Sequence, residues 1–238
     1  LPAGGHSVEW TLRHDGAVVF PGMILEAPRP SMGPEVLPGE YTARISFDDT
    51  VLEQPMTVEQ DPRKRSIGLA DLRAQRDLAL RVRDAISLAN GTVIEIRELR
   101  EKIRARADTA PDQAATLLAA LDDVERTIYQ TKNESPKDKI AYPIQLNDRL
   151  SMLYGSLVFG HGRPTEPQRE VFAVLEQELD EIRRDPHAAA FIVLRHVVVE
   201  VGLGEREADE LEAIFQVLLE EAVTQHELHA ARVEPGFV

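Results

Sequence analysis

The chain of 238 residues contains no cysteine. Disulfide bonds, zinc sites with thiolate ligands and cysteine nucleophiles are therefore excluded. A glycine-rich phosphate loop and a Gly-x-Ser-x-Gly nucleophile elbow are also missing, and Tyr154-Gly155-Ser156 lies inside an apolar helical pattern instead. The missing cysteine assigns no compartment, because an exported bacterial protein can fold without disulfides.

Basic residues and long apolar runs are both scarce. Lys and Arg number 27 against 41 Asp and Glu, and the net charge of −14 would repel nucleic acids and anionic membranes over most of the surface. The best apolar stretch, residues 191–201, is shorter than the roughly 18 residues of a membrane span and is interrupted by Arg195, His196 and Glu200. We therefore expect no nucleic-acid partner and no membrane span.

The chain also has no initiator methionine and no basic, apolar signal segment, since it begins Leu1-Pro2-Ala3-Gly4-Gly5. We expect it to be one piece of a longer polypeptide.

Residues 1–62 have the pattern of β-strands. Apolar and polar residues alternate over 8–13 and over 41–47, which is typical of half-buried strands. Turn signals occur at Asp15-Gly16, after which we expect a strand at Val18–Phe20, and at Pro38-Gly39. This part predicts a small antiparallel β-sandwich of four or five short strands, whose core is small enough to require a neighbour. We expect Trp10, the only tryptophan, in that core.

Residues 63–185 predict an elongated antiparallel α-helical bundle, because apolar residues recur there at spacings of three and four. The first helix covers 68–107, with a kink or break expected at Asn90-Gly91. Pro111 and Pro143 mark the starts of the next two helices, and a fourth follows Pro167. Residues 186–238 predict a helical C-terminal extension, with a shifted reading frame as the alternative. The expected buried stripe of the fourth helix is Val171, Phe172, Val174, Leu175, Leu179 and Ile182.

Several sequence phrases occur in a fixed order across both parts. They include residues 8–13 (Val-Glu-Trp-Thr-Leu-Arg), 38–45 (Pro-Gly-Glu-Tyr-Thr-Ala-Arg-Ile), 129–135 (Tyr-Gln-Thr-Lys-Asn-Glu-Ser) and 142–150 (Tyr-Pro-Ile-Gln-Leu-Asn-Asp-Arg-Leu). From residue 6 to residue 183 this order resembles the C-terminal region of bacterial sortilin-like, BNR-repeat glycosyl hydrolases, which are exported proteins with an N-terminal β-propeller. The chain departs from that pattern at Thr11, where an acidic residue is usual, and at Ala141, where Asn is expected.

The resemblance implies an α+β protein of two domains, with a small antiparallel Ig-like β-sandwich followed by the helical bundle. It also implies an extracytoplasmic location, either periplasmic or secreted, and a partner in the N-terminal β-propeller of the same polypeptide. Hydrolase chemistry in that family would belong to the propeller, so no activity, catalytic residue or cofactor is carried over to this chain.

Three hypotheses for function follow. The first is a noncatalytic C-terminal interaction or spacer module that binds a protein or glycan ligand. The second is a region that completes the substrate cleft of a glycoside hydrolase. The third is a helical dimerisation scaffold, indicated by the long first helix.

Two groups of residues are candidate sites. His226 and His229 lie three apart and could share one helix face as metal ligands, although a solvated helix end is the interpretation we favour. The second group surrounds the loop 133–142 and would form a contact surface at one end of the bundle. The alternative, which we favour, is that its members cap helices and fix the chain's path. The group comprises Tyr129, Thr131, Lys132, Asn133, Tyr142, Asn147 and Arg149.

Overall fold

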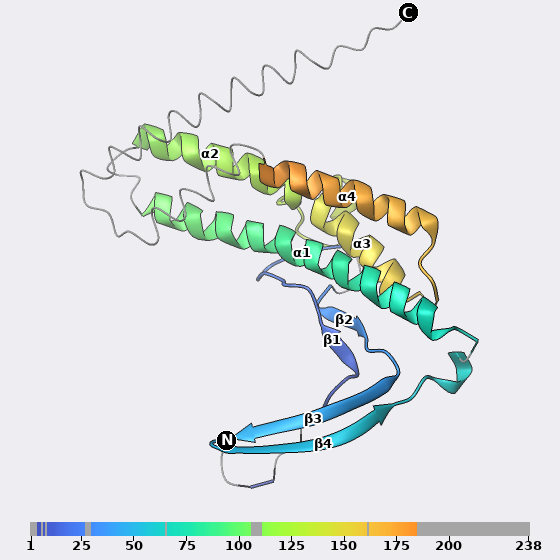
Figure 1. The fold of residues 1–238 in the computed structure, drawn as a ribbon. Coiled ribbons are helices and arrows are strands. Elements are labelled where there is room, and N and C mark those ends of the chain that lie inside the picture. Colours follow the sequence, from blue (N-terminus) through green and yellow to red (C-terminus); the bar gives the residue numbers. More distant parts are fainter. Residues whose placement is uncertain are drawn as a thin grey trace, which may run out of the picture.

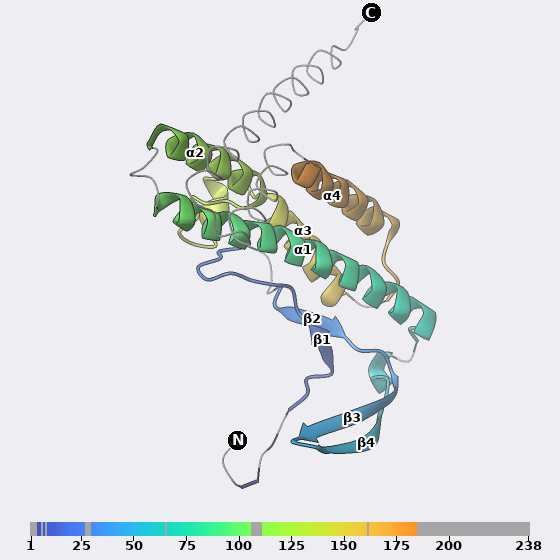
Figure 2. The ribbon, with the colours of Figure 1, turned by 60° about the vertical axis from the view of Figure 1, so that its left-hand side comes forward.

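The computed structural model describes residues 4–5, 7, 9–26, 30–64, 66–105, 111–160 and 162–184. Within these ranges the fold is α+β, with two small antiparallel sheets and four α-helices. Figures 1 and 2 show both sheets on one side of helix α1, with the second sheet extending away from the helices as a long hairpin. The described part of the chain therefore consists of a helical body, a small sheet beside it and one projecting β-hairpin.

The helices form a single bundle around α1. They are α1 (Leu69–Arg104), α2 (Pro111–Ile128), α3 (Leu146–Val158) and α4 (Glu166–Arg184). Helix α1 packs against each of the other three, and its apolar stripe is buried by them, as the spacing of three and four predicts. Buried members of the shared core include Val82, Ile86, Val93, Leu121, Ile128, Leu146, Leu150, Leu157, Phe172, Leu175 and Leu179.

Helix α1 is unbroken at Asn90-Gly91, where the sequence predicts a kink or break. Asn90 is completely buried; its Nδ2 donates to the Val18 carbonyl at 2.7 Å, and its Oδ1 accepts from Asn147 Nδ2 at 3.2 Å. A glycine costs about 1 kcal/mol in a helix relative to alanine, which is small beside the burial along this helix. Tertiary contacts therefore decide the conformation at this point.

The four strands pair in two separate sheets. Strand β1 (Arg13–Asp15) pairs with β2 (Met32–Glu35), and β3 (Gly39–Phe47) pairs with β4 (Thr50–Val58). Close approach of β1 and β2 requires glycine at position 33, because a Cβ there would collide with the His14 carbonyl. In the described ranges no strand joins the two sheets, so the observed β part is two small sheets and not a closed sandwich.

Residues 17–26, which we call the N-terminal segment, run along the helices. The expected strand at Val18–Phe20 does not form, and this stretch has no regular secondary structure. Ala17 and Phe20 are instead buried in the same cluster as the helical core. The Phe20 ring meets Tyr129 edge-on at 5.1 Å, a favoured arrangement for aromatic pairs. The N-terminal part is thus held on the bundle by apolar packing.

Candidate functional site

Side chains of α1 bind the N-terminal segment at its start. Ser87 Oγ accepts a hydrogen bond from the Val18 amide at 3.1 Å, and Asn90 Nδ2 donates to the Val18 carbonyl. Both backbone groups of Val18 are therefore satisfied by helix side chains, in place of a strand partner.

Two further side chains bind the segment at its end. The Tyr129 hydroxyl accepts from the Ile24 amide at 3.0 Å, and Asp148 Oδ2 accepts from the Glu26 amide at 3.1 Å. Tyr129 and Asp148 are both buried, so these bonds are shielded from water. Both residues are anchors for the N-terminal segment.

The predicted contact surface around the loop 133–142 divides into two kinds of residue. Tyr129 and Asn147 are buried and bind other parts of the fold, whereas Thr131 and Lys132 are exposed. The remaining members, Asn133, Tyr142 and Arg149, are half-buried. Lys132 Nζ lies 5.7 Å from the centre of the Tyr142 ring, and Arg149 forms an ion pair with Glu178 on α4. The structure thus gives most of these residues a role in the fold, and their role as a contact surface remains a prediction.

Asp138 organises the loop itself. Its carboxylate accepts from the amides of Glu134 and Ser135, both at 2.7 Å, and these hydrogen bonds hold the pKa of Asp138 below its ordinary value. The charged carboxylate is used to close this turn.

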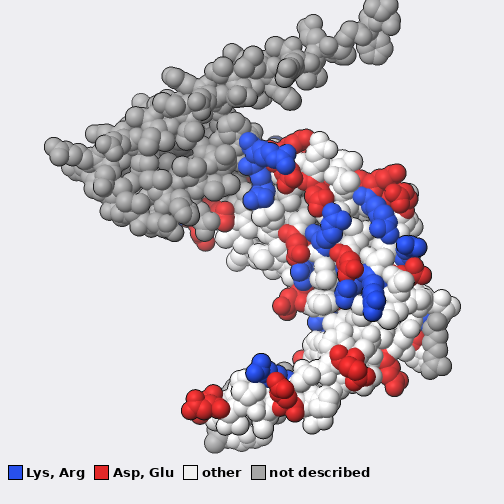
Figure 3. Space-filling model, in the orientation of Figure 1, with Lys and Arg blue, Asp and Glu red and all other residues white. Residues whose placement is uncertain are grey.

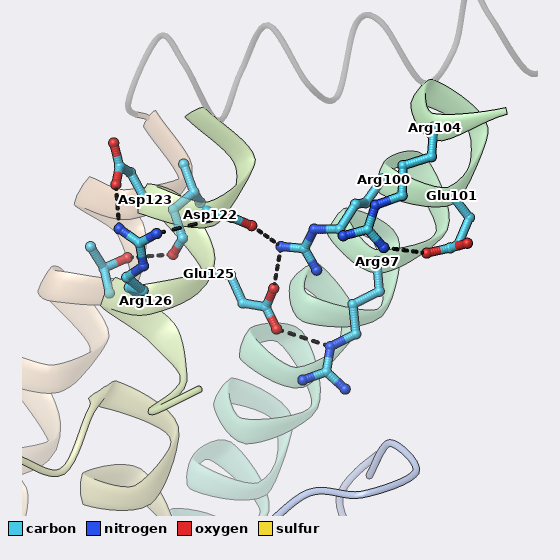
Figure 4. A network of polar contacts seen from close by, with 10 residues as sticks. Arg97, Arg100, Glu101, Arg104, Asp122, Asp123, Glu125 and Arg126 are labelled. Atoms are coloured by element: carbon cyan, nitrogen blue, oxygen red, sulfur yellow. Dashed lines mark hydrogen bonds and ion pairs between the residues drawn. The ribbon is translucent and has the colours of Figure 1, made fainter. Parts of the chain in front are cut away.

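A buried charge cluster joins α1 to α2 (Figure 4). The Glu125 side chain is 3% exposed; it accepts from Arg97 Nε at 2.9 Å and from an Arg100 terminal nitrogen at 2.6 Å. Arg100 also pairs with Asp122 at 2.6 Å. The Arg97 guanidinium lies 4.5 Å from the centre of the Phe20 ring, close enough for a cation–π contact. The cluster connects two helices and the N-terminal segment.

Burial lowers the pKa of Arg100, but hydrogen bonds and attraction from Glu125, together with Asp122, outweigh it, so the pKa of Arg100 is raised overall. Arg100 therefore stays charged, and its ion pairs with Glu125 and Asp122 link α1 to α2.

A cleft of about 440 Å³ lies where the two sheets meet the start of α1 and the end of α3. Its volume is in the range of small-molecule sites. Two pairs of its charged groups bind each other: Arg13 with Glu35 at 3.0 Å, and Arg63 with Asp61 at 2.8 Å. Hydrogen bonds from Arg63 lower the pKa of Asp61 to about 2. Its lining residues include no Ser, His or Cys, so the cleft offers no Ser-His pair for nucleophilic catalysis.

One face of the β3–β4 hairpin is apolar, and we call it the apolar hairpin face. It follows from the register, which places Tyr41 opposite Met56 and Ile45 opposite Leu52. Ile45, Phe47 and Leu52 are 65%, 67% and 64% exposed. At the base of the face Trp10 meets Tyr41 edge-on at 5.5 Å. Trp10 itself is exposed, so the prediction that it lies in a sandwich core is wrong. The apolar members of the face are Tyr41, Ala43, Ile45, Phe47, Leu52 and Met56, and Thr50 and Gln54 lie on the same face.

The opposite face of the hairpin is mainly polar. Thr57 donates to the Glu40 carboxylate at 2.9 Å, and Arg44 pairs with Glu53 at 3.4 Å. The hairpin therefore resembles one layer of a sandwich, with a wet side and an uncovered apolar side.

The described residues contain no group of three His, Asp or Glu side chains placed to hold a metal ion. His226 and His229 lie outside the described residues. No helix in the described part of the chain is long and apolar enough to cross a membrane.

Some of these contacts could have been suspected from the sequence. Asn90 interrupts the apolar stripe of the first helix, and a buried amide requires partners. Neither Asp148 nor Glu125 gives such a signal, because an acid in the first turn of a helix is common, as Asp148 is in α3, and Glu125 is one of several acids on α2.

Comparison of the chain with protein-family models, with curated proteins and with solved structures gives no match.

Proposed function

We propose that this chain is a noncatalytic interaction module of an exported β-propeller protein. In this proposal the apolar hairpin face contacts the β-propeller of the same polypeptide. The observation that carries it is the exposure of Ile45, Phe47 and Leu52 on one face of an isolated hairpin.

Burial of the apolar hairpin face against a neighbouring surface would be energetically favourable. An isolated two-stranded hairpin is marginally stable in water, and sheets become stable when an apolar face is packed. Fully burying a large apolar side chain is worth about 1.5–3 kcal/mol. Covering the exposed parts of the three residues would thus gain several kcal/mol.

The size of the face favours a neighbour in the same polypeptide. Two nine-residue strands span about 30 Å by about 10 Å, or about 300 Å². A stable contact between separate proteins buries about 800 Å² per partner. A covalently linked neighbour needs less area, because its effective concentration is high. Its matching surface would be the apolar face of a sheet, packed about 10 Å away.

Capture of the neighbouring segment tests the proposal. The tagged chain is coexpressed with the polypeptide encoded directly upstream of Leu1 in the same reading frame, and the captured amount is measured. We expect capture by the unsubstituted chain, and Phe47→Asp should reduce it at least tenfold, because a buried unpaired charge is costly.

Val51→Asp is the matched control. Val51 is also exposed and apolar, but it pairs with Ser46 on the opposite face, so its substitution should leave capture unchanged. Equal capture by the two variants, or no capture by the unsubstituted chain, would contradict docking through this face. Hydrolysis of a glycoside by the purified chain would contradict the noncatalytic assignment.

A further inference from the structure

A second uncovered apolar surface lies on the helical body, away from the hairpin. A groove of about 510 Å³ runs between α3 and α4, and we call it the α3–α4 groove. Leu153 and Leu175 are buried in its floor, whereas Val171 and Val174 are 48% and 64% exposed. Its lining residues are Arg149, Met152, Leu153, Glu170, Val171, Val174 and Leu175.

This surface differs from the prediction that the whole apolar stripe of the fourth helix is buried. Helix α4 packs on the bundle through Phe172, Leu175 and Leu179. Val171 and Val174 lie to one side of that line, and Met152 of α3, which is also exposed, continues the patch. The helix therefore has an apolar surface wider than its own bundle covers.

The groove has opposite charges at its two ends. Helices α3 and α4 are antiparallel, since Arg149 pairs with Glu178 while Ser156, near the other end of α3, bonds Gln168 at 3.0 Å. Along α4, Glu170 therefore lies at one end of the groove and Arg149 at the other. Among the described residues, the buried Arg149 Nε has no hydrogen-bond partner.

We propose that the α3–α4 groove binds a second copy of this chain, with the two α4 helices antiparallel about a two-fold axis. In this arrangement the Val171–Val174 patches face each other. Arg149 of each copy approaches Glu170 of the partner subunit, whereas a parallel arrangement would bring two Glu170 carboxylates together. A surface that is apolar at its centre and oppositely charged at its ends matches itself in this way.

The area sets the strength. Helix α3 has 13 residues and α4 has 19, so the face that they share is about 20 Å long and two helices wide, and would bury about 400 Å² per copy, or about 800 Å² in total. That value is typical of weak, reversible contacts between proteins. The dimer should therefore form in the micromolar range. The inference concerns a different surface from the hairpin and stands independently of the proposed function.

Sedimentation equilibrium of the full chain from about 1 to 200 μM tests the inference. We expect the unsubstituted chain to shift from monomer to dimer across this range. Val174→Glu should keep it monomeric throughout. Ala173→Glu is the matched control, because Ala173 is exposed on a different side of α4 and its substitution should leave the dimer intact.

A third variant tests the orientation. Glu170→Gln should raise the dissociation constant two- to fivefold if Glu170 faces Arg149 of the partner subunit, and should lower it if two Glu170 side chains face each other. A lowered constant overturns the antiparallel arrangement. A chain that stays monomeric at 200 μM overturns the proposal. If, in addition, Val174→Glu lowers its melting temperature, another part of the same chain covers the groove.

Discussion

Glu125 shows how a single buried acid can hold two elements together. It is the only acid that contacts both Arg97 and Arg100 among the described ion pairs, and its side chain is nearly inaccessible. Removing one member of a buried ion group leaves the other charges without compensation. The position is therefore far more sensitive than the many surface acids of this chain.

We expect Glu125→Ala to lower the free energy of unfolding by about 2–4 kcal/mol, since both arginines are only partly solvated. Urea unfolding measures the change. Glu101→Ala is the control: Glu101 pairs with Arg104 on the exposed side of α1, and exposed pairs contribute about 0–1 kcal/mol. Similar losses in both variants would contradict a structural role for the buried cluster.

Tyr154 links stability to alkaline pH. Burial raises the pKa of Tyr154 to about 12, against opposing effects of Arg83 and Arg13, and its hydroxyl donates to the Met32 carbonyl at 2.8 Å. Because the folded-state pKa lies above the ordinary value of 10.0, the neutral phenol stabilises the fold below pH 10. This contribution is lost as the pH rises from 10 through about 12.

The prediction is that Tyr154→Phe is less stable than the unsubstituted chain at pH 8 by about 1 kcal/mol, the usual net value of a hydrogen bond. The difference should shrink between pH 10 and pH 12, as the unsubstituted chain loses the same bond. Urea unfolding at a series of pH values gives the comparison. A constant difference over this range would be inconsistent with the raised pKa.

At the scale of elements, the N-terminal segment depends on side chains where a strand would depend on a neighbouring strand. Three of its amides donate hydrogen bonds to side chains of the helical part, namely those of Ser87, Tyr129 and Asp148. Such a segment can open locally when one anchor is lost, without unfolding of the bundle.

We expect Tyr129→Phe to speed hydrogen exchange of the Ile24 amide about 5- to 30-fold, because it removes the acceptor at a cost of about 1–2 kcal/mol. Exchange followed by NMR or mass spectrometry reports it. Tyr142→Phe removes a hydroxyl that makes no contact with this segment and should leave the exchange unchanged. Equal acceleration by both variants would show that Tyr129 does not anchor the segment.

Periodicity in the sequence predicts the helices and the long hairpin, but not the path of the N-terminal segment. The helices follow from spacings of three and four, with Pro111 at the first position of α2 as expected. The alternation over 41–47 lies within β3. The apolar run Val18–Phe20 has the pattern of a strand, but Phe20 packs into the helical cluster instead. An apolar side chain can be buried by a strand or by a helix, and the sequence does not say which.

The candidate sites are also predicted only in part by local sequence patterns. The alternation of Tyr41, Ala43, Ile45 and Phe47 is sufficient to predict that they share a face. It could not predict that the outer part of this face is bare, because coverage depends on what the rest of the chain places there. The sequence indicates only that Tyr129 and Asn147 are polar residues near helix ends. Tyr129 is buried against the N-terminal segment and Asn147 against Asn90 of α1, and no local pattern contains these contacts.

At the scale of the whole molecule, acidic and basic side chains interleave over the visible helical face (Figure 3). Two groups of uncovered apolar residues lie in the hairpin face and in the α3–α4 groove, and others, such as Ile140 and Phe159, lie outside both. Helix α4 lies on the other side of α1 from the β3–β4 hairpin (Figures 1 and 2). The two surfaces can therefore be used at once. A pair joined through α4 would carry two hairpins, so that whatever each hairpin contacts would be held by two attachments.

The uncovered hairpin is exposed to aggregation through the edges of its two strands. Each strand has an outer edge that no described strand covers, and such edges invite copies of a chain to stack into aggregates. Asp48 and Asp49 place two carboxylates at the tip, with Asp48 in the left-handed region at φ 47°. Pro55 in β4 removes one backbone donor. Charges and prolines at such positions act as gatekeepers. The exposed apolar residues of the hairpin can thus bind a neighbour, while Asp48, Asp49 and Pro55 hinder the growth of fibres.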